Sequence, residues 1–278
     1  MTNFIKDKVI VITGAGGGFG RLIAQKAAAL GGKIVCADID ETTLIETVKS
    51  ITTQGGSASY TVASVADLKQ MKSVAAHAIK NHGAIDVMVN NAGIMPLAFY
   101  ADHEAAHDAW SRCIDVNIKG VLNGITSVYD QMMRQGRGHI VNLSSIYGNF
   151  PVVGAGVYGA TKSAVNFLSE SLRVETQGKI KVTIIKPTGV PGTGLGTGII
   201  NRDAIVGILG QNVVSYGSTM AALAEGSNAP ELRDPNNPQY AALDPAYIAD
   251  AVITAINQPW GVSLGDITVR ATGDGYIL

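Results

Sequence analysis

Tyr158 and Lys162 lie four residues apart, and Ser145 lies thirteen residues before the tyrosine, at the end of an apolar run. If a helix begins near Val157, the phenol and the ammonium share one face of it. A free tyrosine has a pKa of about 10, too high for it to accept a proton at neutral pH, and a neighbouring cation lowers that pKa by stabilising the phenolate. A serine at a strand end can hold a carbonyl or alcohol oxygen while the tyrosine moves the proton. A Tyr-x-x-x-Lys pair alone more often belongs to an ordinary helix, so this hypothesis depends on the rest of the chain.

A glycine-rich turn near the amino terminus indicates a phosphate-binding loop. Residues 8–12 read Lys-Val-Ile-Val-Ile, and this short apolar, β-branched run is expected of a buried parallel strand. They run into Thr-Gly-x-x-x-Gly-x-Gly at residues 13–20, and a helical pattern follows over residues 19–30. Strand, glycine turn and helix together present backbone N–H groups to a pyrophosphate. The strict Gly-x-Gly-x-x-Gly fingerprint is not met, because Phe19 and Arg21 stand where it requires glycine.

Asp38 follows the next predicted strand, residues 33–37, and lies eighteen residues after Gly20. A carboxylate at this place accepts hydrogen bonds from an adenosine ribose, although a helix N-cap is an alternative role for Asp38. The 2′-phosphate of NADP would meet this carboxylate with no compensating cation, since Ile39 follows it and Arg21 points into the helix start. The sequence therefore predicts NAD as the cofactor.

The order of the motifs resembles that of the short-chain dehydrogenase/reductase family, from about Lys6 to Lys186. The motifs that carry the resemblance are the glycine turn at residues 13–20, Asn90-Asn91-Ala92-Gly93 after an apolar strand, Asn117, Ser145, and Tyr158 with Lys162.

The resemblance implies a role for each of these polar residues. Asn90 would support the central sheet, and Asn117 would order a proton-relay water. Ser145 would bind the substrate oxygen, and Tyr158 would be the acid/base. Lys162 would lower the pKa of the tyrosine and hold the nicotinamide ribose. The implied catalytic residues are Asn117, Ser145, Tyr158 and Lys162.

The implied cofactor site departs from the family pattern in two places. The chain reads Ala63-Ser64-Val65 where Asp-Val is usual beside the adenine, and Pro187-Thr188-Gly189-Val190 where Pro-Gly is usual, which puts the role of Thr193 in doubt. The cofactor residues implied by the resemblance are Gly14, Gly16, Gly17, Gly18, Phe19, Gly20, Asp38, Ile39, Ser64, Val65, Asn91, Ala92, Gly93, Tyr158, Lys162, Pro187, Thr188, Gly189, Val190 and Thr193.

The family's substrate positions are mostly apolar in this chain and include no lysine or arginine for a carboxylate or phosphate. A hydrophobic secondary alcohol or its ketone, aromatic and cyclic ones included, suits such a wall. The expected pocket residues are Met95, Ser145, Ile146, Tyr147, Val152, Val153, Tyr158 and Val190. An acyl-carrier-protein ketoreductase and a non-catalytic NAD-binding scaffold are the alternatives. The first would want an NADP site and a basic docking patch, and the complete catalytic set argues against the second.

Apolar strand-like runs alternate with helical patterns along the whole chain, which predicts an α/β fold. We expect one domain over residues 1–278, a Rossmann-type doubly wound parallel sheet of about seven strands with helices on both faces. One long helix is expected over residues 104–134. Residues 191–243 interrupt the alternation with spaced glycines, an apolar piece and a polar run. A substrate lid is the preferred interpretation, and a peripheral insertion or an oligomer contact is the alternative.

His103 and His107 form a literal His-Glu-x-x-His, which can bind zinc when a helix places it in a cleft. No downstream cluster supplies a third ligand, so we expect a solvated helical turn and no metal. The apolar end of the chain, residues 276–278, is expected at a subunit interface near a neighbour's pocket.

The composition limits the remaining classes. Charged residues make up 15% of the 278 residues, low against the usual quarter, and apolar residues make up 46%. The family resemblance implies a homotetramer, and the helices around residues 113–133 and 157–172, which are apolar on more than one face, support a homo-oligomer. A net charge of −1 offers no basic field for nucleic acid. No apolar run is long enough for a membrane span, and two cysteines without an implied pairing suit a cytoplasmic protein.

Overall fold

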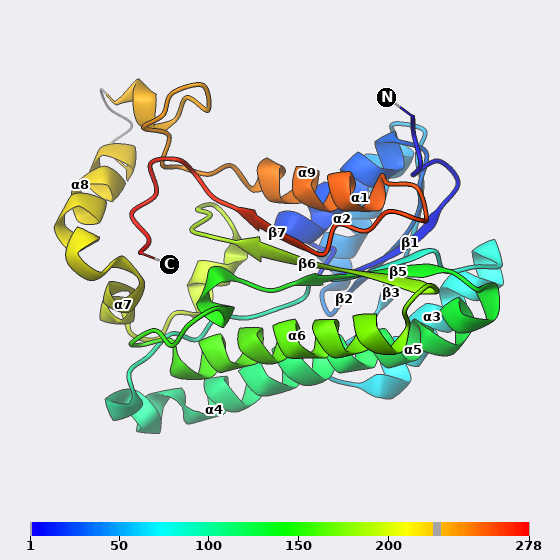
Figure 1. Cartoon of the computed structure of the whole chain (residues 1–278), viewed down its shortest axis with the longest axis horizontal. Helices are drawn as coiled ribbons and strands as arrows, with labels where there is room; N and C mark the ends of the chain where they lie inside the picture. Colours follow the sequence, from blue (N-terminus) through cyan, green and yellow to red (C-terminus); the bar gives the residue numbers. More distant parts are fainter. Residues whose placement is uncertain (1, 225–228, 278) are drawn as a thin grey trace.

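The computed structural model describes residues 2–224 and 229–277. Within them the strands form one parallel sheet in the order β3-β2-β1-β4-β5-β6-β7 (Figure 1). The strands are β1 (Val9–Thr13), β2 (Lys33–Asp38), β3 (Ser57–Val62), β4 (Val87–Asn90), β5 (Gly138–Leu143), β6 (Ile180–Pro187) and β7 (Asp266–Val269). The order reverses between β1 and β4, and in such sheets a ligand crevice opens beyond the carboxyl ends of the strands at that point.

Helices cover both faces of the sheet, as expected for a doubly wound fold. One face carries α1 (Gly18–Ala29), α2 (Glu41–Thr52) and α9 (Pro245–Ile256), and the other carries α3 (Leu68–His82), α5 (Gly120–Gln135) and α6 (Gly156–Glu175), with α4 (His103–Ile114) alongside α6 (Figure 1). Strand β1 explains why both faces are filled, because Ile10 and Ile12 pack with the first group and Val9 and Val11 with the second. Side chains that alternate between two buried faces produce the continuous apolar run seen in the sequence.

The predicted helices and strands agree with the structure to within about two residues, apart from one helix. The single helix expected over residues 104–134 is divided by a π-helical turn, η2 (Asp115–Lys119), between α4 and α5. In a π turn the backbone hydrogen bonds run from residue i to residue i+5, so the helix is locally wider. Asn117 lies in this turn.

The described residues of the 191–243 segment form only short helices, apart from α8 (Val213–Ala224). The others are η4 (Gly194–Gly198), η5 (Arg202–Ile205), α7 (Val206–Leu209), η6 (Gly210–Asn212) and η7 (Pro230–Leu232). Helices α7 and α8 lie beyond one end of the sheet, beside the last residues of the chain (Figure 1). Residues 225–228 of this segment, and Leu278 of the predicted interface tail, lie outside the described residues.

Two further short turns, η1 (Tyr100–Asp102) and η3 (Ile146–Gly148), flank the carboxyl ends of β4 and β5. Within residues 2–224 and 229–277 no helix combines the length and the apolar character that crossing a membrane requires.

Candidate active site

A cavity of about 930 Å³ opens where β1, β2, β4, β5 and β6 end. Residues that follow each of these strands line it, including Gly14, Asp38, Asn91, Ser145 and Thr188. Parallel strands present all their carboxyl ends at one edge, so groups distant in sequence meet there. The 191–243 segment and the end of the chain close the other side.

The glycine turn after β1 is tied to the turn after β4. The Thr13 hydroxyl accepts hydrogen bonds from the backbone N–H of Asn91 (3.0 Å) and of Ala92 (3.2 Å). The Asn91 amide donates to the carbonyl oxygens of Thr13 (2.9 Å) and Gly14 (3.2 Å). Gly14 has a φ of 64°, and a Cβ on Gly20 would overlap the Gly14 carbonyl oxygen. Glycine is therefore required at both positions.

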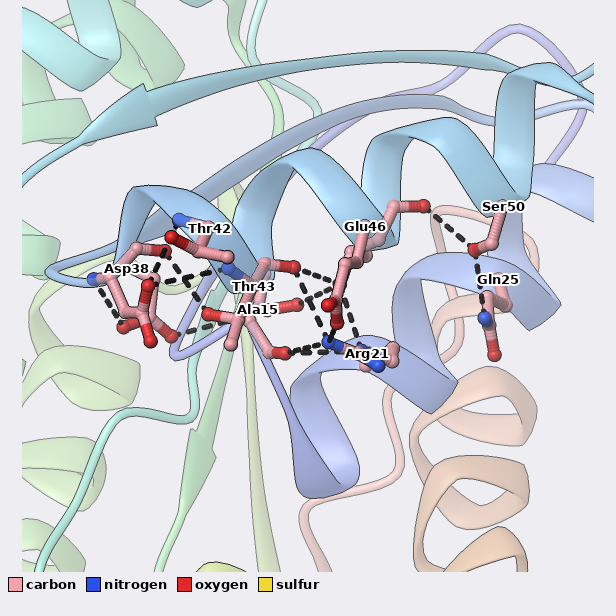
Figure 2. A network of polar contacts seen from close by, with 11 residues as sticks. Ala15, Arg21, Gln25, Asp38, Thr42, Thr43, Glu46 and Ser50 are labelled. Carbon is pink, nitrogen blue, oxygen red and sulfur yellow. Dashed lines mark hydrogen bonds and ion pairs between the residues drawn. The ribbon is translucent and has the colours of Figure 1, made fainter.

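Arg21 binds the same turn from the side of α1, through hydrogen bonds of its guanidinium. Its Nε and Nη2 donate to the carbonyl oxygen of Gly16 at 3.0 and 2.6 Å, and Nη2 also contacts the Glu46 carboxylate at 3.0 Å. Figure 2 shows the guanidinium between α1 and α2, next to Thr43, whose carbonyl oxygen also accepts from it. The sequence prediction that Arg21 points into the helix start agrees with this placement. Its charge is matched by Glu46.

Asp38 lines the cavity at the end of β2 and receives backbone hydrogen bonds on both oxygens. Oδ2 accepts from the N–H of Gly16 (3.0 Å), and Oδ1 accepts from the N–H of Ile39 (2.7 Å). The N-cap of α2 is Asp40, not Asp38, because the Asp40 carboxylate accepts from Thr42 and Thr43. The alternative role for Asp38 as a helix cap is therefore wrong.

Ser145, Tyr158 and Lys162 converge on the cavity from the end of β5 and the first turns of α6. All three are buried, with 6%, 2% and 6% of their surface exposed, and all three line the cavity. The Lys162 ammonium donates to the Leu143 carbonyl oxygen (2.9 Å) and lies 5.7 Å from the centroid of the Tyr158 ring. The helix begins at Gly156, so the predicted spacing does place the phenol and the ammonium on one face.

Burial governs the proton affinities of these groups. Burial raises the pKa of the Tyr158 phenol, the neighbouring Ser145 hydroxyl acts in the opposite direction, and Cys113 adds to the increase. Burial lowers the pKa of the Lys162 ammonium to about 8. Removal from water dominates the pKa of both groups in the protein alone, and the effect of the Lys162 cation on the phenolate stays a prediction. Tyr158 is a protonated phenol at neutral pH and is ready to donate.

Asn117 is buried behind these residues and does not line the cavity. Its Oδ1 accepts from the Ile94 N–H (3.0 Å), and its Nδ2 donates to the Ile94 carbonyl oxygen (3.0 Å) and to Thr161 Oγ1 (3.0 Å). The side chain therefore joins the turn after β4 to α6. Its role in a proton relay stays a prediction.

Asn90 has the structural setting that the resemblance implies. Its amide donates to Asn142 Oδ1 (2.8 Å), and the amide of Asn142 donates to Ser169 Oγ (2.8 Å). This buried chain links β4, β5 and α6 in the middle of the sheet.

The structure brings most of the predicted cofactor residues to the cavity. Gly16 and Gly20 are not part of the wall, because Gly16 faces Asp38 and Thr43 and Gly20 packs under Gly14. The residues that line the wall are Gly14, Gly17, Gly18, Phe19, Asp38, Ile39, Ser64, Val65, Asn91, Ala92, Gly93, Tyr158, Lys162, Pro187, Thr188, Gly189, Val190 and Thr193.

The predicted substrate residues divide into two groups. Met95, Ser145, Tyr147, Tyr158 and Val190 line the cavity. Three residues do not: Ile146 and Val152 are buried in the apolar cluster behind it, and Val153 is 69% exposed. Ile146 and Tyr147 are neighbours in the short turn η3, where successive side chains point in different directions, and Tyr147 takes the inward position.

Several lining residues were not predicted, and two of them are tyrosines. Tyr216 of α8 and Tyr276 near the end of the chain face each other with hydroxyl oxygens 3.4 Å apart. The apolar character of residues 276–278 was the only signal, and it suggested a neighbouring subunit. Tyr276 lines the cavity of its own chain, and a subunit interface at the tail stays a prediction. Other lining residues that were not predicted include Asn212, Ser215, Thr219, Met220, Ala241 and Asp274.

The His-Glu-x-x-His sequence lies outside this cavity. His103, Glu104 and His107 are exposed at the start of α4. In the described part of the chain no group of three His, Cys, Asp or Glu side chains is arranged to hold a metal ion.

Comparisons with known proteins agree with this geometry. The family model "short chain dehydrogenase" matches residues 8–202. An uncharacterized oxidoreductase of Listeria monocytogenes is 34% identical over 98% of this chain and 99% of its own length. A short-chain dehydrogenase/reductase of Burkholderia phymatum, solved with NAD, superposes with a TM-score of 0.75 at 27% identity, covering 96% of this chain and 90% of its own. An alcohol dehydrogenase of Thermococcus sibiricus, solved with 5-hydroxy-NADP, shares the fold with a TM-score of 0.76 at 21% identity, covering 96% and 97%.

Proposed function

Because the chain belongs to the short-chain dehydrogenase/reductase family of oxidoreductases, we propose that it interconverts a hydrophobic secondary alcohol and its ketone with NAD(H). One observation carries the proposal: Ser145, Tyr158 and Lys162 line the same cavity as the carboxylate of Asp38. A nicotinamide cofactor fits this wall, because the glycine turn presents backbone near its rim and Lys162 stands inside it. When bound, the cofactor supplies or accepts the hydride.

The residues of this chain supply the binding and the proton. The Ser145 hydroxyl would donate a hydrogen bond to the substrate oxygen, and the Tyr158 phenol would give its proton to that oxygen as a ketone is reduced. The raised pKa of Tyr158 keeps that proton in place until an acceptor forms. In alcohol oxidation the same atoms act in reverse, and the positive Lys162 would then favour the phenolate.

The preference for NAD rests on charge. Asp38 presents a carboxylate to the cavity, and Lys162, at the catalytic end, is the one lysine or arginine that lines it among the residues described. Arg21 is paired with Glu46 and bound to the glycine turn. A 2′-phosphate beside Asp38 would therefore be repelled without a counter-charge.

Residues 191–243 are proposed as a substrate lid within the single domain of residues 1–278. Leu195, Ile199, Ile205 and Met220 from this segment line the cavity, which gives it an apolar inner side. An apolar ligand would gain contacts with these side chains when they close over it.

The enzyme is proposed to be a homotetramer in the cytoplasm. Phe167 and Val174, two turns apart on α6, are 77% and 73% exposed, and Leu122 on α5 is 43% exposed. A second subunit would cover such positions. Cys36 and Cys113 are buried free thiols, which suits a reducing compartment.

The test is to mix the purified protein with NAD or NADP and a panel of aryl and alkyl secondary alcohols and to follow the absorbance of the reduced cofactor. We expect oxidation with NAD and a large preference over NADP. Asp38→Ser combined with Ile39→Arg should relax or reverse that preference. Equal affinity of the unmodified protein for both cofactors would contradict the argument from Asp38. Reduction of an acyl-carrier-protein thioester with NADPH would favour the ketoreductase alternative, and cofactor binding without turnover would favour a scaffold.

A further inference from the structure

The end of the chain forms part of the cavity wall next to the turn after β6. Tyr276 lines the cavity, and its ring rests directly on the backbone of Gly189. A Cβ at Gly189 would overlap the ring carbons and the hydroxyl of Tyr276. Gly189 precedes Val190, which also lines the cavity, so the ring lies where the turn after β6 meets the space enclosed by residues 191–243.

An ion pair fixes the backbone that carries this ring. Arg270 follows β7 and binds the Asp274 carboxylate through two nitrogens, at 3.0 and 3.3 Å. The Asp274 side chain is 4% exposed. The same guanidinium donates to the carbonyl oxygen of Tyr276 (3.2 Å), and Asp274 Oδ1 accepts from the Tyr276 N–H (3.3 Å). Bidentate contact to a largely buried carboxylate gives this turn a defined geometry.

The other side of the tail is attached to α7, η6 and α8. The Tyr276 and Tyr216 rings lie 5.9 Å apart at 57°, with their hydroxyl oxygens 3.4 Å apart. Asn212 Nδ2 donates to the Gly275 carbonyl oxygen (3.0 Å), and the Ile277 N–H donates to the Ile208 carbonyl oxygen (3.0 Å). Tyr276 is therefore held from two directions.

We propose that Tyr276 is a specificity-determining residue, which forms with Tyr216 an aromatic wall that selects a substrate carrying a flat ring. This inference rests on the proposed function and adds the substrate class. Aromatic faces bind other rings in tilted or offset arrangements. Tyr147 lies on the same cavity and contacts Tyr158 edge-on, with ring centroids 5.5 Å apart, so the ring-lined region reaches the acid/base. Burial raises the pKa of the Tyr276 and Tyr147 phenols, which keeps both neutral against an apolar ligand.

The first test compares kcat/KM for 1-phenylethanol and 2-butanol in the unmodified enzyme and in Tyr276→Ala. We expect the ratio of the two values to fall about tenfold or more in the variant, because the lost ring contact serves the aryl alcohol alone. Tyr276→Phe should keep most of the ratio, and Tyr276→Leu replaces Tyr276→Ala if the latter does not fold. The dissociation constant for NAD is measured in the same variants, because Tyr276 contacts Gly189 of the predicted cofactor residues, and it should change less than the ratio does.

The matched control is Tyr240→Ala. Tyr240 is 7% exposed and its carbonyl oxygen accepts from Gly273 at the base of the tail, but Tyr240 does not line the cavity. This variant should lower thermal stability and leave the ratio unchanged. The proposal is overturned if Tyr276→Ala and Tyr276→Leu also leave the ratio within about threefold of the unmodified enzyme, or if Tyr240→Ala lowers it equally.

A second measurement separates this inference from the proposed function. Calorimetry of acetophenone and 2-butanone binding to the NADH complex requires no turnover. Selective binding of acetophenone that is lost in Tyr276→Ala supports the aromatic wall even if no alcohol is oxidised, an outcome that would contradict only the proposed reaction. Turnover of alcohols with no preference for the aryl compounds would overturn the wall and leave the proposed function standing. Binding of neither ketone would count against both.

Discussion

The two halves of the cavity are held by different kinds of contact. In the glycine-loop half, formed by the turns after β1, β2 and β4, side chains bind backbone: Thr13 and Arg21 hold the turn, and backbone N–H groups hold Asp38. In the tyrosine half, formed by η3, α8 and the tail, ring contacts such as the Tyr147–Tyr158 and Tyr216–Tyr276 pairs form the cavity wall, and the Arg270–Asp274 ion pair holds the tail.

The difference matches what each half would bind. Backbone-directed hydrogen bonds fix one shape, which suits a ligand that never varies, whereas ring contacts depend on side chains that substitution can change without breaking the fold. Tyr158 and Lys162 lie between the halves. Variants should therefore affect cofactor binding and substrate selection separately, except at this junction.

The largest effect is expected at the junction, for Tyr158→Phe. The substitution removes the hydroxyl that moves the proton and keeps the ring that packs edge-on against Tyr147. The rate should fall by about two to four orders of magnitude while the dissociation constant for NAD stays nearly unchanged. Steady-state kinetics and a cofactor titration measure the two quantities. Tyr147→Phe is the control, because it removes a hydroxyl from the same wall. Retention of more than about a tenth of the activity in Tyr158→Phe would show that another group moves the proton.

Lys162→Met tests the cost of burying a charge at the junction. The folded pKa of Lys162 is about 8 and its ordinary value is 10.5. Between these pH values the unfolded chain holds the extra proton, so the free energy of unfolding rises with pH across this window. The substitution removes that contribution. Between pH 7.5 and 10.5 the free energy of unfolding of the unmodified protein should thus rise by up to about 3 kcal/mol relative to that of Lys162→Met.

Denaturant titrations of the cofactor-free protein at several pH values measure this difference. Lys8→Met is the counterpart outside the cavity, because burial, followed by repulsion from Lys181, lowers the pKa of Lys8 to about 8. The Lys8→Met variant should lose a similar rise of the free energy of unfolding with pH. Tyrosines whose pKa values are raised in the folded protein lower the free energy of unfolding only when the pH exceeds their ordinary pKa of about 10. Their contribution is the same in both proteins. If the free energy of unfolding depended on pH in the same way in the unmodified protein and in Lys162→Met, the lowered pKa of Lys162 would be contradicted.

Arg21→Leu should weaken the glycine-loop half alone. The guanidinium contacts the Gly16 and Thr43 carbonyl oxygens and the Glu46 carboxylate, and hydrogen bonds of charged groups contribute about 1.5–3 kcal/mol. The dissociation constant for NAD should therefore rise about tenfold, with the aryl-to-alkyl preference intact. The control is Lys26→Leu on the same helix, since Lys26 pairs with Asp250 of α9 and does not touch the loop. A change of substrate preference in Arg21→Leu would break the separation between the halves.

The same division explains what the sequence could predict. The glycine-loop half consists of short motifs at the ends of strands, so spacing predicted Asp38 and the family resemblance implied Asn91. Both line the cavity. The sheet followed from runs such as residues 8–12, because burial on both faces leaves no polar gap. The π turn around Asn117 was not predicted, since it is a single turn whose first residue, Asp115, and the following Gly120 keep right-handed helical angles.

The tyrosine half depends on contacts that no local pattern encodes. Tyr276 meets Gly189 and Tyr216 only because β7, the outermost strand beside β6, returns the chain to the carboxyl ends of the strands. Short turns between residues 194 and 212 have no period from which an inward face could be predicted. Val153 was expected in the pocket because the family resemblance places pocket residues there, and its side chain is exposed. Predicting a substrate from sequence therefore fails first where the wall is assembled from distant segments.

The smallest effect is expected for His103→Ala with His107→Ala, a double variant that serves as a control outside both halves of the cavity. These side chains are exposed at the start of α4 and line neither half of the cavity, so the double variant should keep its rate within a few-fold, and EDTA should leave activity unchanged. Glu104 is exposed beside them, and a glutamate that activates a metal-bound water needs a cleft that excludes bulk solvent. Metal analysis of the purified protein, before and after the double substitution, measures the same point directly. The role of Tyr158 would be contradicted if the protein contained one zinc ion per chain and the double substitution removed both the zinc and the turnover. The reaction would then be assigned to α4.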